Sequence, residues 1–137
     1  MLIRSICAIG QSGQLGLNGV LPWEGAREQP YVDDVARFFD MTRGHVLLAG
    51  PKTIESVPQF AYQQMTPVAI RSHERPEDVL VRYLGRTVFI GGGPALWDVY
   101  APYIQHWDIT KLPYDGPADR WFNPTWLVAR RAISYST

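Results

Sequence analysis

The sequence predicts an α/β domain in three layers, with a mostly parallel central sheet covered by helices on both faces. Two observations carry this prediction. Short apolar runs alternate with amphipathic segments, which is typical of βαβ units. Loops rich in glycine or charge follow four of the apolar runs. With 137 residues, of which 46% are hydrophobic, the chain has the size of one compact domain, so we treat residues 1–137 as a single unit.

The strands are predicted from the short apolar runs. They are expected at 2–9, 46–49, 67–70, 87–90 and 107–110, with one last strand starting at Trp126. Ligands of parallel sheets bind where the carboxyl ends of the strands meet loops. Ile9, Ala49, Ile70 and Ile90 each precede such a loop, so we expect a nucleotide site built from these four loops.

The helices are predicted from apolar residues at helical spacing. The longest, over 32–43, carries Val35, Phe38, Phe39 and Thr42 at this spacing, with two acids in its first turn. Three shorter helices open with proline, which suits the first helical turn. They are expected over 51–57, 76–84 and 94–104.

Charge and composition argue against several classes of partner and binding site. The formal net charge is zero, which argues against a nucleic-acid partner, since phosphate binding leaves a basic surplus. Cys7 is the single cysteine, so an intramolecular disulfide is excluded. The three histidines lack ligand spacing, so no metal site is expected. No run is long enough to span a bilayer and no leader pattern is seen, which predicts a cytoplasmic protein without a membrane partner.

Several motifs occur in a specific order along the chain. They read IGQSGQLGLNGVLPW from Ile9, DVARFF from Asp34, VLLAGPKTIESV from Val46, VFIGGGPALWDVY from Val88, DIT from Asp108 and ADRWFNP from Ala118. In this order and spacing, over about residues 1–125, they resemble the dihydrofolate reductase family. The resemblance implies that family's three-layer fold, and the reduction of 7,8-dihydrofolate to tetrahydrofolate with hydride from NADPH.

Asp34 is the residue on which this resemblance places the substrate. A pterin presents a ring N–H and an exocyclic amine side by side, and a carboxylate accepts from both at once. Without the resemblance, a solvated acid at a helix start is the favoured interpretation of Asp34, and the resemblance reverses this. Asp33 stays an alternative, although its side chain points about 100° away around the helix.

The resemblance also implies the other residues around the substrate. Phe38 would press on the pterin ring, Thr110 would bond the Asp34 carboxylate, and Trp23 would hold a water or simply pack in the core. The implied catalytic residues are Asp34, Leu21, Trp23 and Thr110. The implied substrate contacts are Ile6, Ala8, Asp34, Phe38, Val57, Ile90 and Thr110.

The glycine triplet after the fourth apolar run belongs to the implied cofactor site. Glycines there would let the backbone pass under the nicotinamide and diphosphate without a Cβ, and the family often has a cis peptide between two of them. The implied NADPH contacts are Ala8, Leu15, Gly16, Asn18, Gly50, Lys52, Thr53, Arg71, Ser72, Gly91, Gly92, Gly93, Pro94, Ala95 and Leu96. Of these, Leu15, Gly16 and Asn18 belong, with Leu21, to a loop that would close over the nicotinamide.

The sequence departs from the family at the charged contacts. Pro51 and Pro94 stand where the family has basic residues for the cofactor phosphates. Arg71, Ser72, His73 and Arg75 would then take the 2′-phosphate, which keeps NADPH ahead of NADH. Met65 stands where an arginine would clamp the glutamyl tail of folate. A smaller pterin or weak folate binding would follow, unless Arg37 compensates.

Two further departures concern the chain's organisation. The segment between Trp23 and Asp34 is longer than usual, so the loop over the site is expected to be remodelled. Only one strand is expected near the C-terminus, which leaves a sheet edge. The protein is therefore expected to be a monomer, or a homodimer through this edge.

Two other functions compete with dihydrofolate reduction. One is a reductase of another pterin or of a pyrimidine, as in riboflavin synthesis, although Asp34 with Phe38 argues against the pyrimidine. The other is a non-catalytic relative that keeps the fold and the nucleotide site.

Overall fold

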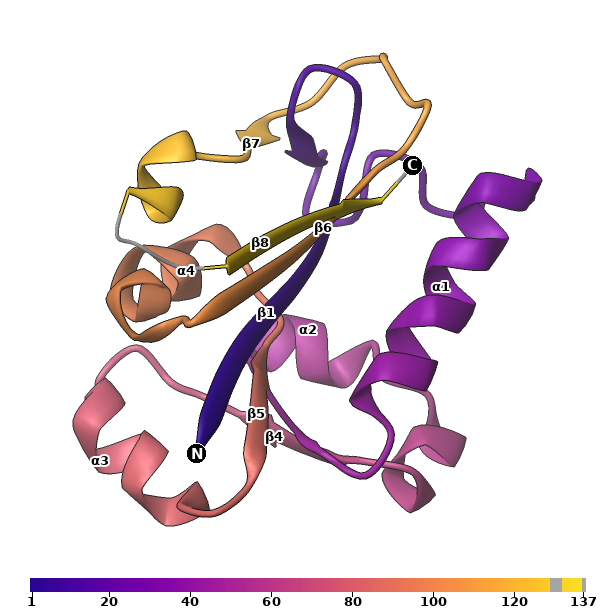
Figure 1. Cartoon of the computed structure of the whole chain (residues 1–137). Coiled ribbons are helices and arrows are strands. Elements are labelled where there is room, and N and C mark those ends of the chain that lie inside the picture. The colour runs from indigo at the N-terminus through magenta and orange to yellow at the C-terminus, as the bar shows by residue number, and fades with distance from the viewer. Residues whose placement is uncertain (129–131, 137) are drawn as a thin grey trace.

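The fold is built on one six-stranded sheet. The computed structural model describes residues 1–128 and 132–136. The sheet order is β4 (Thr66–Ala69), β3 (Val46–Ala49), β5 (Thr87–Ile90), β1 (Leu2–Ile9), β6 (His106–Lys111) and β8 (Ala132–Ser136). Each neighbouring pair is parallel, so the carboxyl ends of these strands meet at one edge of the sheet (Figure 1).

A short antiparallel ribbon lies beyond that edge. It pairs β2 (Gln14–Gly16) with β7 (Arg120–Trp121). The Asn18 N–H adds a hydrogen bond of 2.9 Å to the Asp119 carboxylate. The ribbon thereby ties the loop after β1 to the segment after β6.

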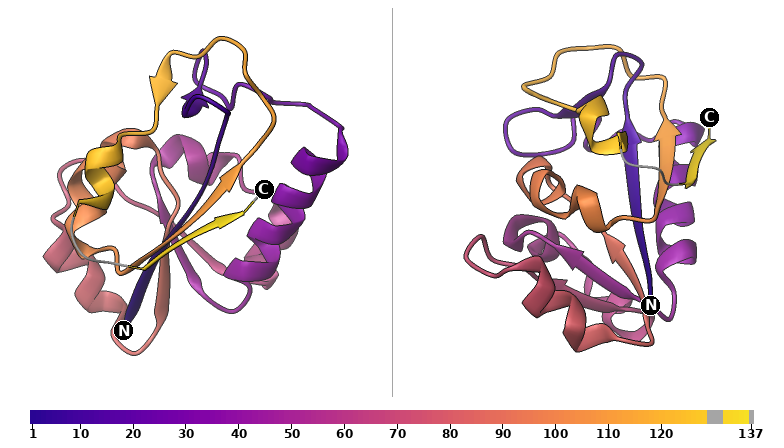
Figure 2. Two further views of the ribbon diagram at one scale, coloured as in Figure 1. Left: turned by 45° about the horizontal axis from the view of Figure 1, so that its top comes forward. Right: turned by 60° about the vertical axis from the view of Figure 1, so that its left-hand side comes forward.

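Helices cover both faces of the sheet (Figures 1 and 2). The α-helices are α1 (Gln29–Thr42), α2 (Pro51–Glu55), α3 (Pro76–Leu80) and α4 (Pro94–Tyr100). Short 3-10 turns follow or link them: η1 (Gln59–Gln63), η2 (Val81–Tyr83), η3 (Ala101–Tyr103) and η4 (Pro124–Leu127). The predicted three-layer α/β architecture is confirmed.

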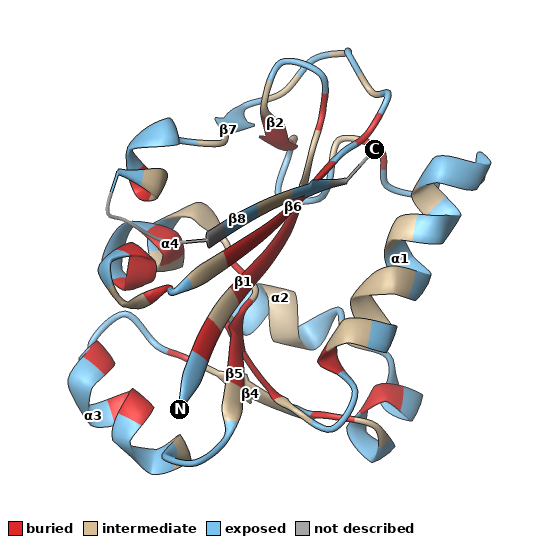
Figure 3. Ribbon diagram, viewed as in Figure 1, coloured by how far each residue is buried: buried red, intermediate tan, exposed pale blue. Residues whose placement is uncertain are grey.

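Strand alternation divides the core into two clusters, because successive side chains point to opposite faces. On the α1 face, Ile6, Leu47 and Phe89 pack with Phe38, Phe39 and η1. On the α4 face, Val46, Val88 and Ile109 pack with Trp97, Trp107 and Trp126. The buried residues follow the central strands in Figure 3.

Helix α1 and the last strand have bounds that differ from the predicted ones. Helix α1 begins at Gln29 instead of residue 32, since Pro30 is accepted in a first helical turn. The single strand predicted from Trp126 is wrong in its first part: Trp126 lies in η4, buried against Trp97 and Trp107, and β8 begins at Ala132. Residues 129–131 of that prediction lie outside the described part.

No helix in residues 1–128 or 132–136 is long and apolar enough to cross a bilayer.

Candidate active site

The glycine triplet forms the turn between β5 and α4. The Gly91 N–H donates to the Leu48 carbonyl at 2.8 Å, and the Gly50 N–H donates to the Gly92 carbonyl at 2.9 Å. The turn after β5 is therefore bonded to the turn after β3. The Gly92–Gly93 peptide is cis, as the resemblance implied.

The space available for a Cβ differs among the three glycines. A Cβ on Gly91 would lie 2.8 Å from Leu47 Cδ1, and one on Gly92, where φ is +99°, would lie 2.9 Å from the Trp97 ring. These two residues are glycine because of the protein's own packing. Around Gly93 a Cβ would meet nothing within 4 Å, so this backbone faces open space that a flat ligand can use.

A cavity of about 600 Å³ opens between α1, the loop before it and η1. Its lining residues are Leu21, Trp23, Glu24, Gly25, Ala26, Tyr31, Val32, Asp34, Val35, Ala36, Phe39, Pro58 and Phe60. The walls are mainly apolar and aromatic. The charged side chains in this lining are Asp34 and Glu24, and no lysine or arginine from the described residues belongs to it. Such a site suits a flat, uncharged heterocycle with hydrogen-bond donors.

Asp34 is half-buried on α1 at the wall of this cavity. Burial raises the pKa of its carboxyl, while a hydrogen bond from Thr110 and the charge of Arg37 lower that pKa. Asp34 is thus a carboxylate in an apolar site with two groups that favour its ionised form. Asp33 is exposed and accepts a 2.6 Å hydrogen bond from Gln29, so the alternative acid does not face the cavity.

Leu21 and Trp23 also line the cavity, as the resemblance placed them at the substrate. The buried Trp23 ring lies 6.2 Å from Tyr31 and 5.7 Å from Tyr114, centroid to centroid. The Trp23 side chain therefore lines the cavity and also packs the loop before α1 against Tyr31 and Tyr114.

Other residues assigned to the substrate do not line this cavity. Ile6, Phe38 and Val57 belong to the hydrophobic cluster under α1. Ile90 is fully buried on the α4 face, because alternation along β5 turns Phe89, not Ile90, toward α1. Ala8 lies on β1 opposite Thr110 of β6.

Sequence reasoning missed several lining residues. Phe39, rather than Phe38, reaches the cavity, and Tyr31, Glu24 and Phe60 were not singled out. One signal was available: Tyr31, Val35 and Phe39 recur every fourth residue, which places them in one row on α1.

The residues assigned to the cofactor surround the carboxyl edge of the sheet. Lys52, Arg71 and Ser72 are exposed, and Thr53 is half-buried in α2. Pro94, Ala95 and Leu96 form the first turn of α4 after Gly93. Leu15 is buried in β2, and Gly16 and Asn18 belong to the loop that the ribbon ties down. Exposed cations beside an open glycine backbone fit a phosphate-bearing dinucleotide.

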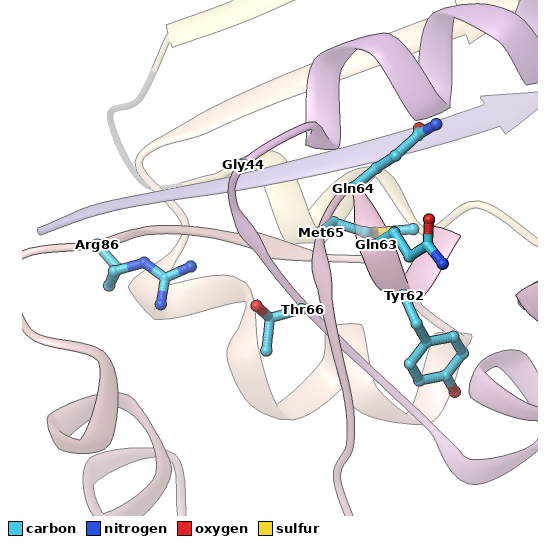
Figure 4. A pocket seen from close by; sticks show the side chains of 7 residues that line it. All are labelled: Gly44, Tyr62, Gln63, Gln64, Met65, Thr66 and Arg86. Atoms are coloured by element: carbon cyan, nitrogen blue, oxygen red, sulfur yellow. The ribbon is translucent and has the colours of Figure 1, made fainter. Parts of the chain in front are cut away.

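A second, smaller hollow lies at the opposite end of the strands (Figure 4). It measures about 220 Å³ and is lined by Gly44, Tyr62, Gln63, Gln64, Met65, Thr66 and Arg86. These residues lie at or before the amino ends of β3, β4 and β5, away from the edge where α/β sheets bind ligands.

Comparison with known proteins shows the family of the chain. No family model matches the chain. The chain is 67% identical over 126 residues to a dihydromethanopterin reductase of Methylorubrum extorquens, covering 92% of this chain and 93% of the relative. The chain belongs to the dihydrofolate reductase-like family. It is also 21% identical over 131 residues to a dihydrofolate reductase of Staphylococcus haemolyticus, covering 88% of this chain and 75% of that protein.

Family membership supports an oxidoreductase that acts on a pterin. It does not confirm dihydrofolate as the substrate of this family member. Of the functions considered from the sequence, the comparison favours the reductase of another pterin.

Proposed function

We propose that this family member reduces dihydromethanopterin by hydride transfer, with NADPH as the reductant. The observation that carries the proposal is the half-buried Asp34 carboxylate on the wall of an apolar cavity. The identity of 67% to a dihydromethanopterin reductase supports the choice of pterin.

Among residues 1–128 and 132–136, no cation belongs to the lining, which also supports a pterin other than folate. Met65, where the family's arginine would meet the glutamyl tail, is 6% exposed and packed under α1. Glu24 adds a negative charge at the cavity instead. A glutamyl carboxylate would therefore find no bidentate partner at Met65, and at the cavity it would meet the negative charge of Glu24.

Reduced nicotinamide supplies the hydride when it is bound. The chain's residues orient the acceptor: Asp34 accepts hydrogen bonds from the ring N–H and the exocyclic amine and so fixes the ring in the cavity. Val35, Phe39 and Phe60 provide apolar surface that excludes water from the ring. Thr110 of β6 lowers the pKa of the Asp34 carboxyl and would orient it toward the pterin.

Phosphate contacts are proposed for the charged and polar residues at the carboxyl edge. Lys52, Arg71 and Ser72 would meet the 2′-phosphate, and Thr53 would donate a hydrogen bond to a phosphate oxygen. Gly93 would leave room for the cofactor beside the backbone.

The test is NADPH oxidation, followed at 340 nm, with dihydromethanopterin and dihydrofolate as separate substrates. We expect turnover with dihydromethanopterin and a lower kcat/KM with dihydrofolate. Asp34→Asn should lower kcat/KM at least about tenfold, because the pterin loses its charged anchor. Asp33→Asn is the matched control, since it removes the same charge from the exposed neighbour. Equal losses of kcat/KM in both variants, or no loss in Asp34→Asn, would show that Asp34 is not the residue that binds the pterin.

A further inference from the structure

A buried carboxylate on β6 gathers three basic side chains beneath α1. Asp108 is 4% exposed. It accepts a 2.7 Å hydrogen bond from Arg4, and its other oxygen lies 3.4 Å from His106 Nε2 and 3.9 Å from Arg37 Nη2. Asp108 and Thr110 are two residues apart on one strand, so both side chains point to the α1 face.

Arg37 joins this cluster to the cavity. Its Nη1 donates to Thr110 Oγ1 at 2.6 Å, while its Nη2 faces Asp108. It lies three residues after Asp34 on α1, one helical turn away. The planar guanidinium can address both partners at once, which a lysine ammonium does less well.

The hydrogen bond from Arg37 determines whether the Thr110 hydroxyl acts as a donor or an acceptor toward its other partner. A threonine hydroxyl has one proton to donate, and an oxygen that accepts from Arg37 keeps that proton for another acceptor. Asp34 lies one turn before Arg37 on α1, and the Thr110 hydroxyl lowers the pKa of its carboxyl, so we take this carboxylate as the acceptor. The chain of contacts therefore runs from Asp108 through Arg37 and Thr110 to Asp34.

We infer that Arg37 is a positioning residue: held by Asp108, it fixes the Thr110 hydroxyl as a donor to Asp34 and so keeps that carboxylate in its pterin-binding form. The link to pterin binding rests on the proposed function. The link to Asp34 rests on the Arg37–Thr110 hydrogen bond and on the place of Asp34 one turn before Arg37, and it can be measured without substrate.

Several charged or titratable groups surround this chain of contacts, and each belongs to the pH dependence. They are Arg37 and Tyr31 of α1, Glu24 of the preceding loop, Arg4 and Cys7 of β1, and His106 and Asp108 of β6. Burial raises the pKa of the Cys7 thiol, and the charges of Asp34 and Asp108 raise it further, so this thiol stays neutral.

The test is a carbon-13 NMR titration of the Asp34 carboxyl in the ligand-free protein, with the resonance assigned by its loss in Asp34→Asn. Arg37→Gln should move this titration to higher pH, and Arg37→Lys should restore only part of the shift. Arg43→Gln removes the same charge from the exposed end of α1 and should leave the titration in place. In a Thr110→Val background, Arg37→Gln should shift it less.

Kinetics give the second readout. With dihydromethanopterin, Arg37→Gln should lower kcat/KM about tenfold, which is the equivalent of one charge-assisted hydrogen bond in a half-buried site. The pH dependence of kcat/KM should shift to higher pH together with the NMR titration. An unmoved Asp34 titration in Arg37→Gln, or an equal shift in Arg43→Gln, would overturn the inference. Wild-type protein that turns over no dihydropterin would refute the proposed function, while the NMR titration would still decide the role of Arg37.

Discussion

Gly91→Ala tests whether the glycine turn is shaped by the protein's own core. The added Cβ would lie 2.8 Å from Leu47 Cδ1, so Leu47 would have to move by about 0.6 Å to reach ordinary contact. Leu47 is 1% exposed and packed among Ile6 and Phe89, which leaves little room for that movement.

Overpacking of this kind costs about 1–3 kcal/mol of unfolding free energy. For a domain of 137 residues this corresponds to a fall in Tm of about 3–10 °C. The assay is urea unfolding followed by tryptophan fluorescence, since Trp97, Trp107 and Trp126 are buried in the core.

The matched control is Gly50→Ala at the neighbouring turn. There φ is −64° and the nearest atom to an added Cβ is the Gly92 oxygen at 3.9 Å, so the unfolding free energy should change by less than about 0.5 kcal/mol. Leu47→Val removes the clashing methyl group and should reduce the cost of Gly91→Ala when the two changes are combined. An undiminished cost in the double variant would refute the steric explanation.

Two other predictions concern titratable groups. Because burial raises the pKa of Asp34 in the folded state, the native state holds its proton to higher pH than the unfolded state, and stability falls as pH rises from the ordinary carboxyl range to that raised value. Asp34→Asn should therefore lose this decline and be at least as stable as wild type at neutral pH in urea titrations; a less stable variant would contradict the sign. Cys7 is 7% exposed and burial raises its pKa, so a thiol reagent should label it only after unfolding, with labelling complete in urea and slow in buffer. Rapid labelling of the native protein would show that β1 opens.

The sequence predicted the sheet well because strands depend on local patterns. Short apolar runs indicated the strands of the sheet. The family order of motifs singled out Asp34, which lines the cavity, and its role as the pterin anchor stays a prediction. The family order of motifs also anticipated the cis peptide at the glycine turn.

The missed features depend on contacts between distant residues. Arg37 meets Thr110 across 73 positions, and Arg4 meets Asp108 across 104, so no local pattern indicates either pair. The face of Ile90 is set by its register beside β1 and β3. The first part of the predicted last strand was wrong because Trp126 packs against the rings of Trp97 and Trp107 instead of pairing in the sheet.

The pairing of β1 with β6 has a consequence for refolding. These strands lie far apart in the sequence, and β6 carries Thr110, which lowers the pKa of the Asp34 carboxyl on α1. Closing so long a loop is slow compared with forming helices or neighbouring turns. Recovery of enzymatic competence after dilution from denaturant should therefore lag behind recovery of helical circular dichroism.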